Sequence, residues 1–133
     1  MVDIIDPKTS TVRPVAFHAI FDCSGCDIDK MKNEANIKNW LADLTPKIGL
    51  TATGTATVTA GETSGLVGYV AVQLAGSNSI DANFVDANRE IYIDIFANDQ
   101  FNPEVVEASI KEFFGNGVNI RKILIPRNAS AAV

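Results

Sequence analysis

The segment Glu90-Ile-Tyr-Ile-Asp-Ile-Phe96 alternates strictly between two sets of side chains. Because successive side chains of a strand point to opposite faces of a sheet, the three isoleucines would share one face. The other face would carry Tyr92, Asp94 and Phe96. The segment therefore predicts a β-strand with one continuous aliphatic face.

A helix is predicted directly after this strand. Asn102-Pro103-Glu104 is a favourable helix start, because asparagine can cap the first turn and proline at the first helical position loses no needed donor. Gly115-Asn-Gly117 ends the pattern. The apolar stripe of this helix comprises Val105, Val106, Ile110, Phe113 and Phe114.

An earlier helix is predicted between Asp27 or Asp29, either of which can cap it, and the stop formed by Pro46 and Gly49. Its apolar residues recur at near-helical spacing and are Ile28, Met31, Ile37, Trp40, Leu41 and Leu44.

Four further strands are predicted at residues 15–22, 50–60, 67–74 and 118–125, with a turn at 61–65. The resulting order is β-α-β-β-β-α-β. Two helices with apolar stripes must be buried on one face of the sheet, so we predict an α/β (α+β) two-layer sandwich. The sheet should be mainly antiparallel, because the middle strands are joined by connections too short for a crossover helix. The other face would be partly exposed or used in assembly.

The chain of 133 residues fits one domain, residues 1–133, which can bury roughly two-thirds of its unfolded surface. Residues 1–13 and 128–133 are expected to be flexible ends. A net charge of −5 with scattered basic residues disfavours nucleic-acid binding. No apolar run is long enough to span a membrane, and the first residues lack the features of a secretory signal, so we expect a cytoplasmic protein.

Cys23-Ser-Gly-Cys26 places two cysteines between a predicted strand and a predicted helix, where the helix dipole can stabilise a thiolate. A redox dithiol is one interpretation, and two reduced, partly buried cysteines in a turn are the other. A structural zinc ion would need two more ligands and only His18 is at hand, so we predict no metal site. His18 has no partner identifiable from the sequence, which fits a core or interface histidine better than a general base.

The stretch between residues 74 and 84, Leu-Ala-Gly-Ser-Asn-Ser-Ile-Asp-Ala-Asn-Phe, holds Ser77 and Ser79. Neither serine has a neighbouring histidine or lysine to take its proton, so neither is a conventional hydrolase nucleophile. Carboxylates follow in the same region at Asp81, Asp86, Glu90 and Asp94. They form either a solvated face or a site for the amine or sulfonium group of a cationic ligand, for which we select Asp86 and Glu90.

Several motifs together resemble a known family. They are His18-Ala-Ile-Phe-Asp-Cys-Ser-Gly-Cys-Asp27, Lys47-Ile-Gly-Leu-Thr51, the Ser64-Gly65 turn before an apolar strand, Tyr92-Ile-Asp-Ile-Phe-Ala97 and Ile120-Arg-Lys-Ile123. In this order they resemble the short prokaryotic S-adenosylmethionine decarboxylases of polyamine (spermidine) biosynthesis, over roughly His18 to Arg127. Most of these motifs belong to the framework of that fold.

Members of this family are made as proenzymes that cut themselves before a serine, which becomes a covalently bound pyruvoyl group. That group supplies the electron sink for loss of carbon dioxide from S-adenosylmethionine. The resemblance implies that Ser77 is the pyruvoyl precursor and that Ser64 assists processing. It places Asp81 where the family has its processing histidine and Asn98 where it has a proton-donating cysteine.

The residues around Ser77 depart from the family pattern of Leu-Ala-Glu-Ser-His. Gly76 replaces the glutamate, Asn98 cannot donate a proton as a thiol can, and neither Asn78 nor Asp81 titrates near neutral pH as an imidazole does. We therefore predict an S-adenosylmethionine decarboxylase-like protein in which Ser77 is not cut. No cofactor is expected, since a pyruvoyl group would form only if self-cleavage occurred.

Two alternatives remain open at this point. One is a non-catalytic homologue that acts as a binding, regulatory or structural subunit, and the other is a redox protein that uses Cys23 and Cys26. If the chain is active, it would be a lyase acting on S-adenosylmethionine or a related amine. Family members form dimers through their sheets, and a face with Tyr92 and Phe96 suits such a homo-oligomer.

Overall fold

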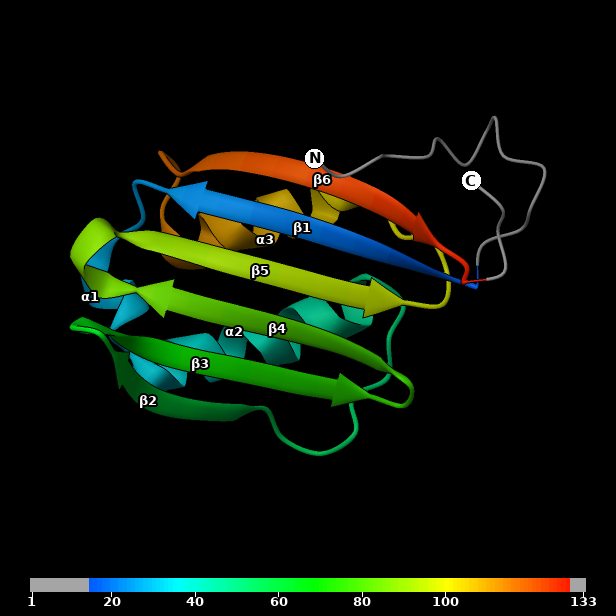
Figure 1. Cartoon of the computed structure of the whole chain (residues 1–133), viewed down its shortest axis with the longest axis horizontal. Helices are drawn as coiled ribbons and strands as arrows, with labels where there is room; N and C mark the ends of the chain where they lie inside the picture. Colours follow the sequence, from blue (N-terminus) through cyan, green and yellow to red (C-terminus); the bar gives the residue numbers. More distant parts are fainter. Residues whose placement is uncertain (1–14, 130–133) are drawn as a thin grey trace.

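The computed structural model describes residues 15–129 and contains one sheet with helices on one side (Figure 1). Every pair of neighbouring strands is antiparallel, and the spatial order is β2-β3-β4-β5-β1-β6. The strands are β1 (Ala16–Ser24), β2 (Thr57–Thr63), β3 (Leu66–Ala75), β4 (Asn78–Val85), β5 (Glu90–Ala97) and β6 (Asn119–Arg127). The helices are α1 (Ile28–Met31), α2 (Glu34–Lys47) and α3 (Pro103–Phe114), with a short 3₁₀ turn η1 (Asp86–Asn88) after β4.

Alternation along the strands separates a buried face from an open face. The isoleucines of β5 are fully buried against the helices. Alternate residues of β1 and β4 are buried on the same side, namely Ala19, Phe21 and Cys23 on β1 and Ile80, Ala82 and Phe84 on β4. Tyr92, Asp94 and Phe96 lie on the other face of β5, as the alternation predicts. We call this second side, which no helix covers, the open face (Figure 1).

Polar side chains fix where the helices begin. Asn102 accepts a hydrogen bond from the backbone N–H of Glu104 at 3.0 Å, and Pro103 occupies the first turn of α3. Asp27 caps α1 in the same way, and Asn33 caps α2. These caps begin each helix directly after a turn, so the apolar stripes meet the sheet.

The sheet and the helix layer meet at Trp40 of α2. Its ring is fully buried and packs edge-to-face against Phe84 of β4 and Phe114 of α3, with centroid distances of 6.5 and 5.2 Å. Aromatic side chains bury large apolar areas in this geometry. One aromatic cluster therefore ties α2, α3 and β4 together.

The two-layer, antiparallel architecture with helices on one face is confirmed, but the strand count predicted from the sequence is wrong. Residues 78–85 form a sixth strand, β4, where the sequence suggested a loop. The strand predicted at 50–60 begins only at Thr57, because residues 51–56 instead form a loop held by the Gln73 amide, which donates to the Gly54 carbonyl at 3.1 Å. The single helix expected after Asp27 is divided at Lys32 and Asn33 into α1 and α2.

The prediction of flexible ends at 1–13 and 128–133 falls almost entirely outside the described residues. Among residues 15–129, none of the helices has the length and apolar character required to cross a bilayer.

Candidate functional site at the β3–β4 turn and on the open face

Ser77 lies in the tight turn that joins β3 to β4. Gly76 and Ser77 are the only two residues between the strands, and Gly76 has a positive φ of 63°. A two-residue hairpin loop with glycine first is the pattern of a type II′ turn, in which a side chain at the first position would be strained. The turn is therefore closed by glycine, and it presents Ser77 exposed at the end of the sheet.

The structure brings Ser77 and Asn98 together. The Ser77 hydroxyl donates a hydrogen bond to Oδ1 of Asn98 at 2.8 Å. The Asn98 backbone N–H donates in turn to Oδ1 of Asn78 at 3.0 Å, and the Gly76 N–H donates to the Thr53 hydroxyl at 2.8 Å. The turn is thus held by neutral amide and hydroxyl groups.

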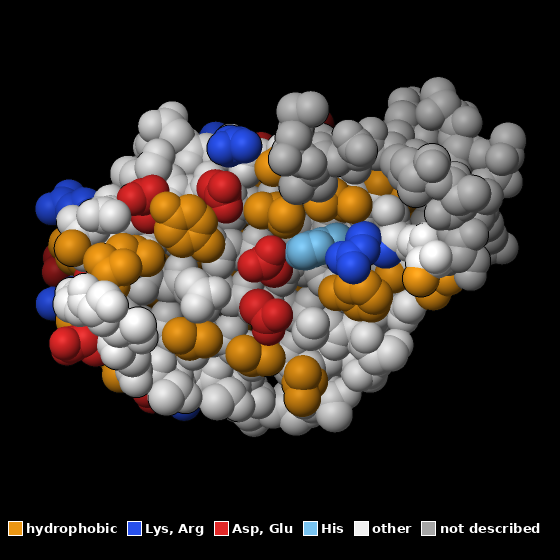
Figure 2. Space-filling view, viewed as in Figure 1, with side chains coloured by type: hydrophobic (Ala, Val, Ile, Leu, Met, Phe, Trp, Pro, Cys, Tyr) orange, Lys and Arg blue, Asp and Glu red, His pale blue; other side chains and the backbone are white. Residues whose placement is uncertain are grey.

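A group of charged side chains lies in the middle of the open face, and we call it the polar cluster: His18, Asp81, Asp94 and Arg127. Figure 2 shows two acidic side chains next to the histidine and a basic side chain, among apolar side chains of the same face. The residues come from β1, β4, β5 and β6, which are adjacent in the sheet. Four neighbouring strands thus each contribute one member.

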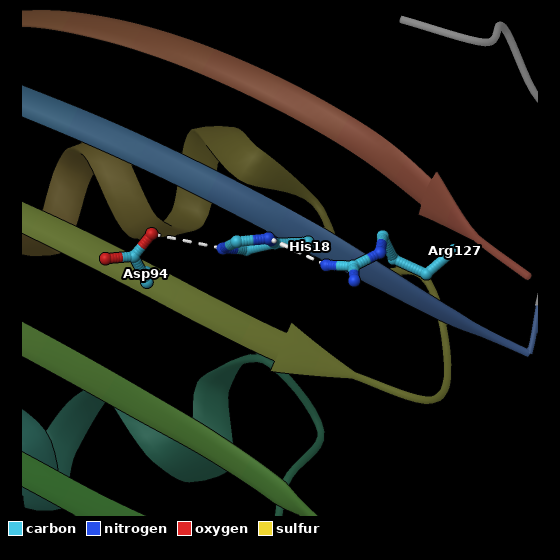
Figure 3. Close-up of polar contacts among 3 residues, drawn as sticks. All are labelled: His18, Asp94 and Arg127. Carbon is cyan, nitrogen blue, oxygen red and sulfur yellow. Dashed lines mark hydrogen bonds and ion pairs between the residues drawn. The ribbon is translucent and has the colours of Figure 1, made fainter. Parts of the chain in front are cut away.

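Both ring nitrogens of His18 have partners, as Figure 3 shows. Nε2 lies 3.0 Å from Oδ1 of Asp94, and Nδ1 lies 3.2 Å from a guanidinium nitrogen of Arg127. Because a guanidinium can only donate, Nδ1 must accept, and Nε2 then carries the proton that is donated to Asp94. The contacts fit a neutral imidazole whose tautomer is set by its neighbours.

Asp81 and Asp94 are directly opposite each other on β4 and β5. Burial raises the pKa of Asp81, the negative charge of Asp94 raises it further, and His18 lowers it. Like charges opposite each other in a sheet are destabilising. The position where the resemblance expects the processing histidine is therefore held by an electrostatically disfavoured carboxylate.

Ser64, Asp86 and Glu90 lie at the opposite end of the sheet from Ser77. The ten residues of β3 separate the Ser64 turn from the Ser77 turn, a length of about 33 Å. Glu90 accepts a hydrogen bond from the Tyr92 hydroxyl at 2.7 Å. Asp86 lines a cavity of about 180 Å³, together with Lys32, Ala60, Val67, Gly68 and Tyr69. The structure therefore does not bring Ser64 close to Ser77 within one chain.

Cys23 and Cys26 are free and buried, with 2% and 1% of their surfaces exposed. Burial raises the pKa of Cys23 to about 12, with a further contribution from Cys26. Burial also raises the pKa of Cys26 to about 11, and Glu90 adds to the effect. Both groups are thiols at neutral pH, which is unfavourable for nucleophilic redox chemistry because the thiolate is the reactive form.

Arg127 belongs to the polar cluster, although no pattern in the sequence indicated it as a site residue. It is 109 positions from His18 along the chain, and only the pairing of β1 with β6 brings the two together. Within residues 15–129, no three His, Cys, Asp or Glu side chains gather closely enough to bind a metal ion.

Comparison with known proteins agrees with this fold. The model of the S-adenosylmethionine decarboxylase family matches residues 17–124. Among solved structures, the adenosylmethionine decarboxylase of Aquifex aeolicus is similar, with a TM-score of 0.66 and 14% sequence identity, covering 92% of this chain and 99% of that one. No curated protein sequence matches significantly. Because the family model covers well over half of the chain, the protein belongs to the S-adenosylmethionine decarboxylase family.

Proposed function

We propose that this chain is a member of the family that is not self-processed and acts as a non-catalytic binding or assembly subunit. The observation that carries this proposal is the hydrogen bond from the Ser77 hydroxyl to the Asn98 amide. A place in polyamine metabolism rests on the family resemblance and is part of the same proposal.

Self-cleavage makes chemical demands that the surroundings of Ser77 do not meet. The hydroxyl has to lose a proton to attack the Gly76 carbonyl carbon, and the leaving amine has to gain one. An asparagine side chain neither takes up nor releases a proton at neutral pH. The only histidine of the chain, His18, already uses both ring nitrogens for Asp94 and Arg127. These residues do not fit the formation of a pyruvoyl group at Ser77.

Intact mass spectrometry of the denatured protein tests the proposal. We expect one species of 14.2 kDa, unchanged on storage, and the same behaviour from Ser77→Ala. We also expect no release of labelled carbon dioxide from carboxyl-labelled S-adenosylmethionine. Two fragments that meet between Gly76 and Ser77 in the wild type, and are absent in Ser77→Ala, would overturn the proposal.

A small-molecule ligand with an amine or sulfonium group remains part of the proposal, with Asp86 and Glu90 as its binding residues. The cavity beside Asp86 supports this assignment, because Oδ1 of Asp86 is buried and has no hydrogen-bond partner among the described residues. Buried acceptors without a partner are costly, and a donor from a ligand would remove that cost.

Thermal-shift measurements with S-adenosylmethionine test ligand binding without requiring turnover. We expect a concentration-dependent rise of the melting temperature that is reduced in Asp86→Asn and in Glu90→Gln. Asp29→Asn, at an exposed position on α1, is the matched control and should respond as the wild type does. An equal shift in all four proteins would show that the ligand does not use Asp86 or Glu90.

A second copy of the chain is the proposed partner, bound through the open face. The side chains of this face include Val70, Val72, Leu74, Tyr92 and Phe96, and Val70 and Leu74 are exposed by 41% and 54%. Six strands spaced about 4.8 Å apart and about 25 Å long give a face of roughly 600 Å², which is of the order that stable interfaces bury per partner. Exposed apolar side chains that gather on one face are commonly covered in an assembly.

A further inference from the structure

The turn between α3 and β6 carries an asparagine followed by a glycine, Asn116-Gly117, and no other asparagine of the chain precedes a glycine. Both residues are exposed. They are the two central residues of a β-turn, which the Val118 backbone N–H closes by donating to the Gly115 carbonyl at 3.3 Å. The pair therefore lies at a solvent-exposed turn tip, outside any helix or strand.

Two neighbouring groups of this turn tip can react with each other, namely the side-chain amide of Asn116 and the backbone nitrogen of Gly117. Within residues 15–129, neither group has a hydrogen-bond partner. The amide of Asn98 is different, because its Oδ1 accepts from the Ser77 hydroxyl at 2.8 Å and its Nδ2 donates to the Val15 carbonyl at 3.4 Å. The Asn116 amide is thus free to turn toward the Gly117 nitrogen, whereas the Asn98 amide is held.

Glycine after the asparagine removes the usual steric obstacle to this approach. It has no Cβ beside the backbone nitrogen, and it reaches backbone angles that other residues rarely adopt. A Cβ built on Gly117 would have no atom within 4 Å apart from its chain neighbours. The space around the Gly117 nitrogen is therefore open, and Asn116 alone combines exposure, a free amide and a following glycine.

We propose that Asn116 is a modification site, at which the folded chain converts the asparagine to aspartate and isoaspartate. The Gly117 nitrogen loses its proton to solvent and forms a bond to Cγ of Asn116, and the side-chain nitrogen leaves as ammonia. Water then opens the resulting succinimide ring. Cleavage between the ring nitrogen and Cγ gives aspartate, and cleavage between the ring nitrogen and the main-chain carbonyl carbon gives isoaspartate. Water is the only reactant consumed, and nothing is oxidised or reduced.

The position of the turn gives this modification a structural effect. The new carboxylate lies just beyond the C-terminus of α3, where the helix dipole disfavours negative charge. The neighbouring Gly115 lies against Asp27, because a Cβ added to it would be 3.9 Å from the Asp27 nitrogen. Isoaspartate also adds one carbon to the main chain between α3 and the buried Val118. Both products should therefore loosen the junction of α3 with β6.

Incubation of the folded full chain, followed by mass spectrometry, tests the proposal. We expect the intact mass to rise by about 1 Da as ammonia is released, and peptide mapping to place the change at Asn116. The rate should be higher at pH 8 than at pH 6, because the attacking nitrogen has to lose a proton. Isoaspartate should also accept a labelled methyl group from an isoaspartyl methyltransferase. The chain stays uncut, so this change is distinct from a cleavage between Gly76 and Ser77.

Gly117→Ala is the matched control, because the added methyl group meets no neighbour and the backbone there is not left-handed. This variant keeps Asn116 but should convert it about tenfold more slowly or less, since a Cβ crowds the attacking nitrogen. Asn98 should remain unmodified in both proteins. Asn116→Asp carries the added charge from the start and should melt at a lower temperature than the wild type. Circular dichroism checks that each variant is folded.

The contrary results are equally definite. A native protein that keeps Asn116 intact for weeks at pH 8, while the same chain converts in denaturant, would show that the fold protects the turn and would overturn the proposal. Equal rates in the wild type and Gly117→Ala, or faster conversion at another asparagine of the native protein, would overturn it as well. An unchanged melting temperature of Asn116→Asp would refute the structural effect of the added charge.

Discussion

At the scale of single residues, burial determines what Cys23 and Cys26 can do. Both thiols lie in the core, and their pKa values are raised to about 12 and about 11 from the ordinary 9.0. The unfolded chain would release the thiol protons near pH 9, while the folded chain retains them. The stabilisation from these thiols is therefore fully present below about pH 9 and is lost as the pH rises toward 11 and 12.

Denaturant unfolding at several pH values measures this loss. We expect the free energy of unfolding of the wild type to fall by about 1 kcal/mol per thiol between pH 8 and pH 10. In Cys23→Ala/Cys26→Ala the same decline should be shallower, even though the double variant is less stable at every pH. Parallel curves would show that the thiols ionise equally in both states.

A thiol reagent provides a second readout for the same two residues. Modification of the native protein should be slow at pH 7.5 and should become rapid in denaturant, because the thiolate is both rare and covered in the fold. Fast modification of two thiols in the native protein would instead support the redox interpretation of the Cys23 to Cys26 motif.

Sequence reasoning identified some residues of the candidate site and missed others, and the difference has a physical reason. Ser77 and Asn98 were paired only through the family resemblance, and the structure places them 2.8 Å apart. The contact between His18 and Arg127 had no sequence signal, because it depends on the register of two strands at opposite ends of the chain. Residue type is visible in a sequence, but register across a sheet is set by the whole fold.

At the scale of elements, β3 and β4 approach closely at the end of the sheet that is far from Ser77. A Cβ atom added to Gly68 of β3 would lie 1.7 Å from the carbonyl oxygen of Phe84 on β4. No side chain fits at that distance, so glycine is required by the approach of the two backbones. Gly61 of β2 faces Gly68 across the sheet and has ordinary space around it, with the nearest atom 3.7 Å away.

Alanine substitution at each of these two glycines should distinguish the cost of a backbone clash from the ordinary effect of replacing glycine in a strand. We expect Gly68→Ala to lower the free energy of unfolding by about 3 kcal/mol, because one backbone has to move. Gly61→Ala should change it by less than about 1 kcal/mol. Equal effects in thermal or denaturant unfolding would contradict the clash at Gly68.

The strand missed by sequence reasoning, β4, shows the limit of local propensity. Asparagine, serine and aspartate supply four of its eight residues, and asparagine and aspartate are depleted in strands. The alternation of buried Ile80, Ala82 and Phe84 was present but short. Pairing with β3 on one side and β5 on the other overrides the weak propensity. The helices and β5 were predictable because their periodicity extends over more residues.

At the scale of the whole molecule, one core joins both layers. Trp40 is the only tryptophan, and it contacts aromatic rings of β4 and α3. Loss of either layer would expose its ring. The two-layer class was predictable from the sequence, because two helices with apolar stripes need a sheet to cover them.

A single core predicts cooperative unfolding. Tryptophan fluorescence, which reports on the junction of the layers, and far-ultraviolet circular dichroism, which reports on all elements, should give coincident transitions in denaturant. The midpoints should agree at a protein concentration low enough to keep the oligomeric state fixed. Separate midpoints would show that the sheet and the helix layer unfold independently.

The pairing of β1 with β6 brings two distant parts of the chain to the same corner of the sheet. The Val15 backbone N–H donates to the Arg127 carbonyl at 2.9 Å. Since neighbouring strands lie about 4.8 Å apart, a few added residues could join these positions, and the chain could be opened between Gly76 and Ser77 instead. Such a circular permutant would keep every strand pairing. It would also carry from synthesis the same break that self-cleavage leaves in other members of the family.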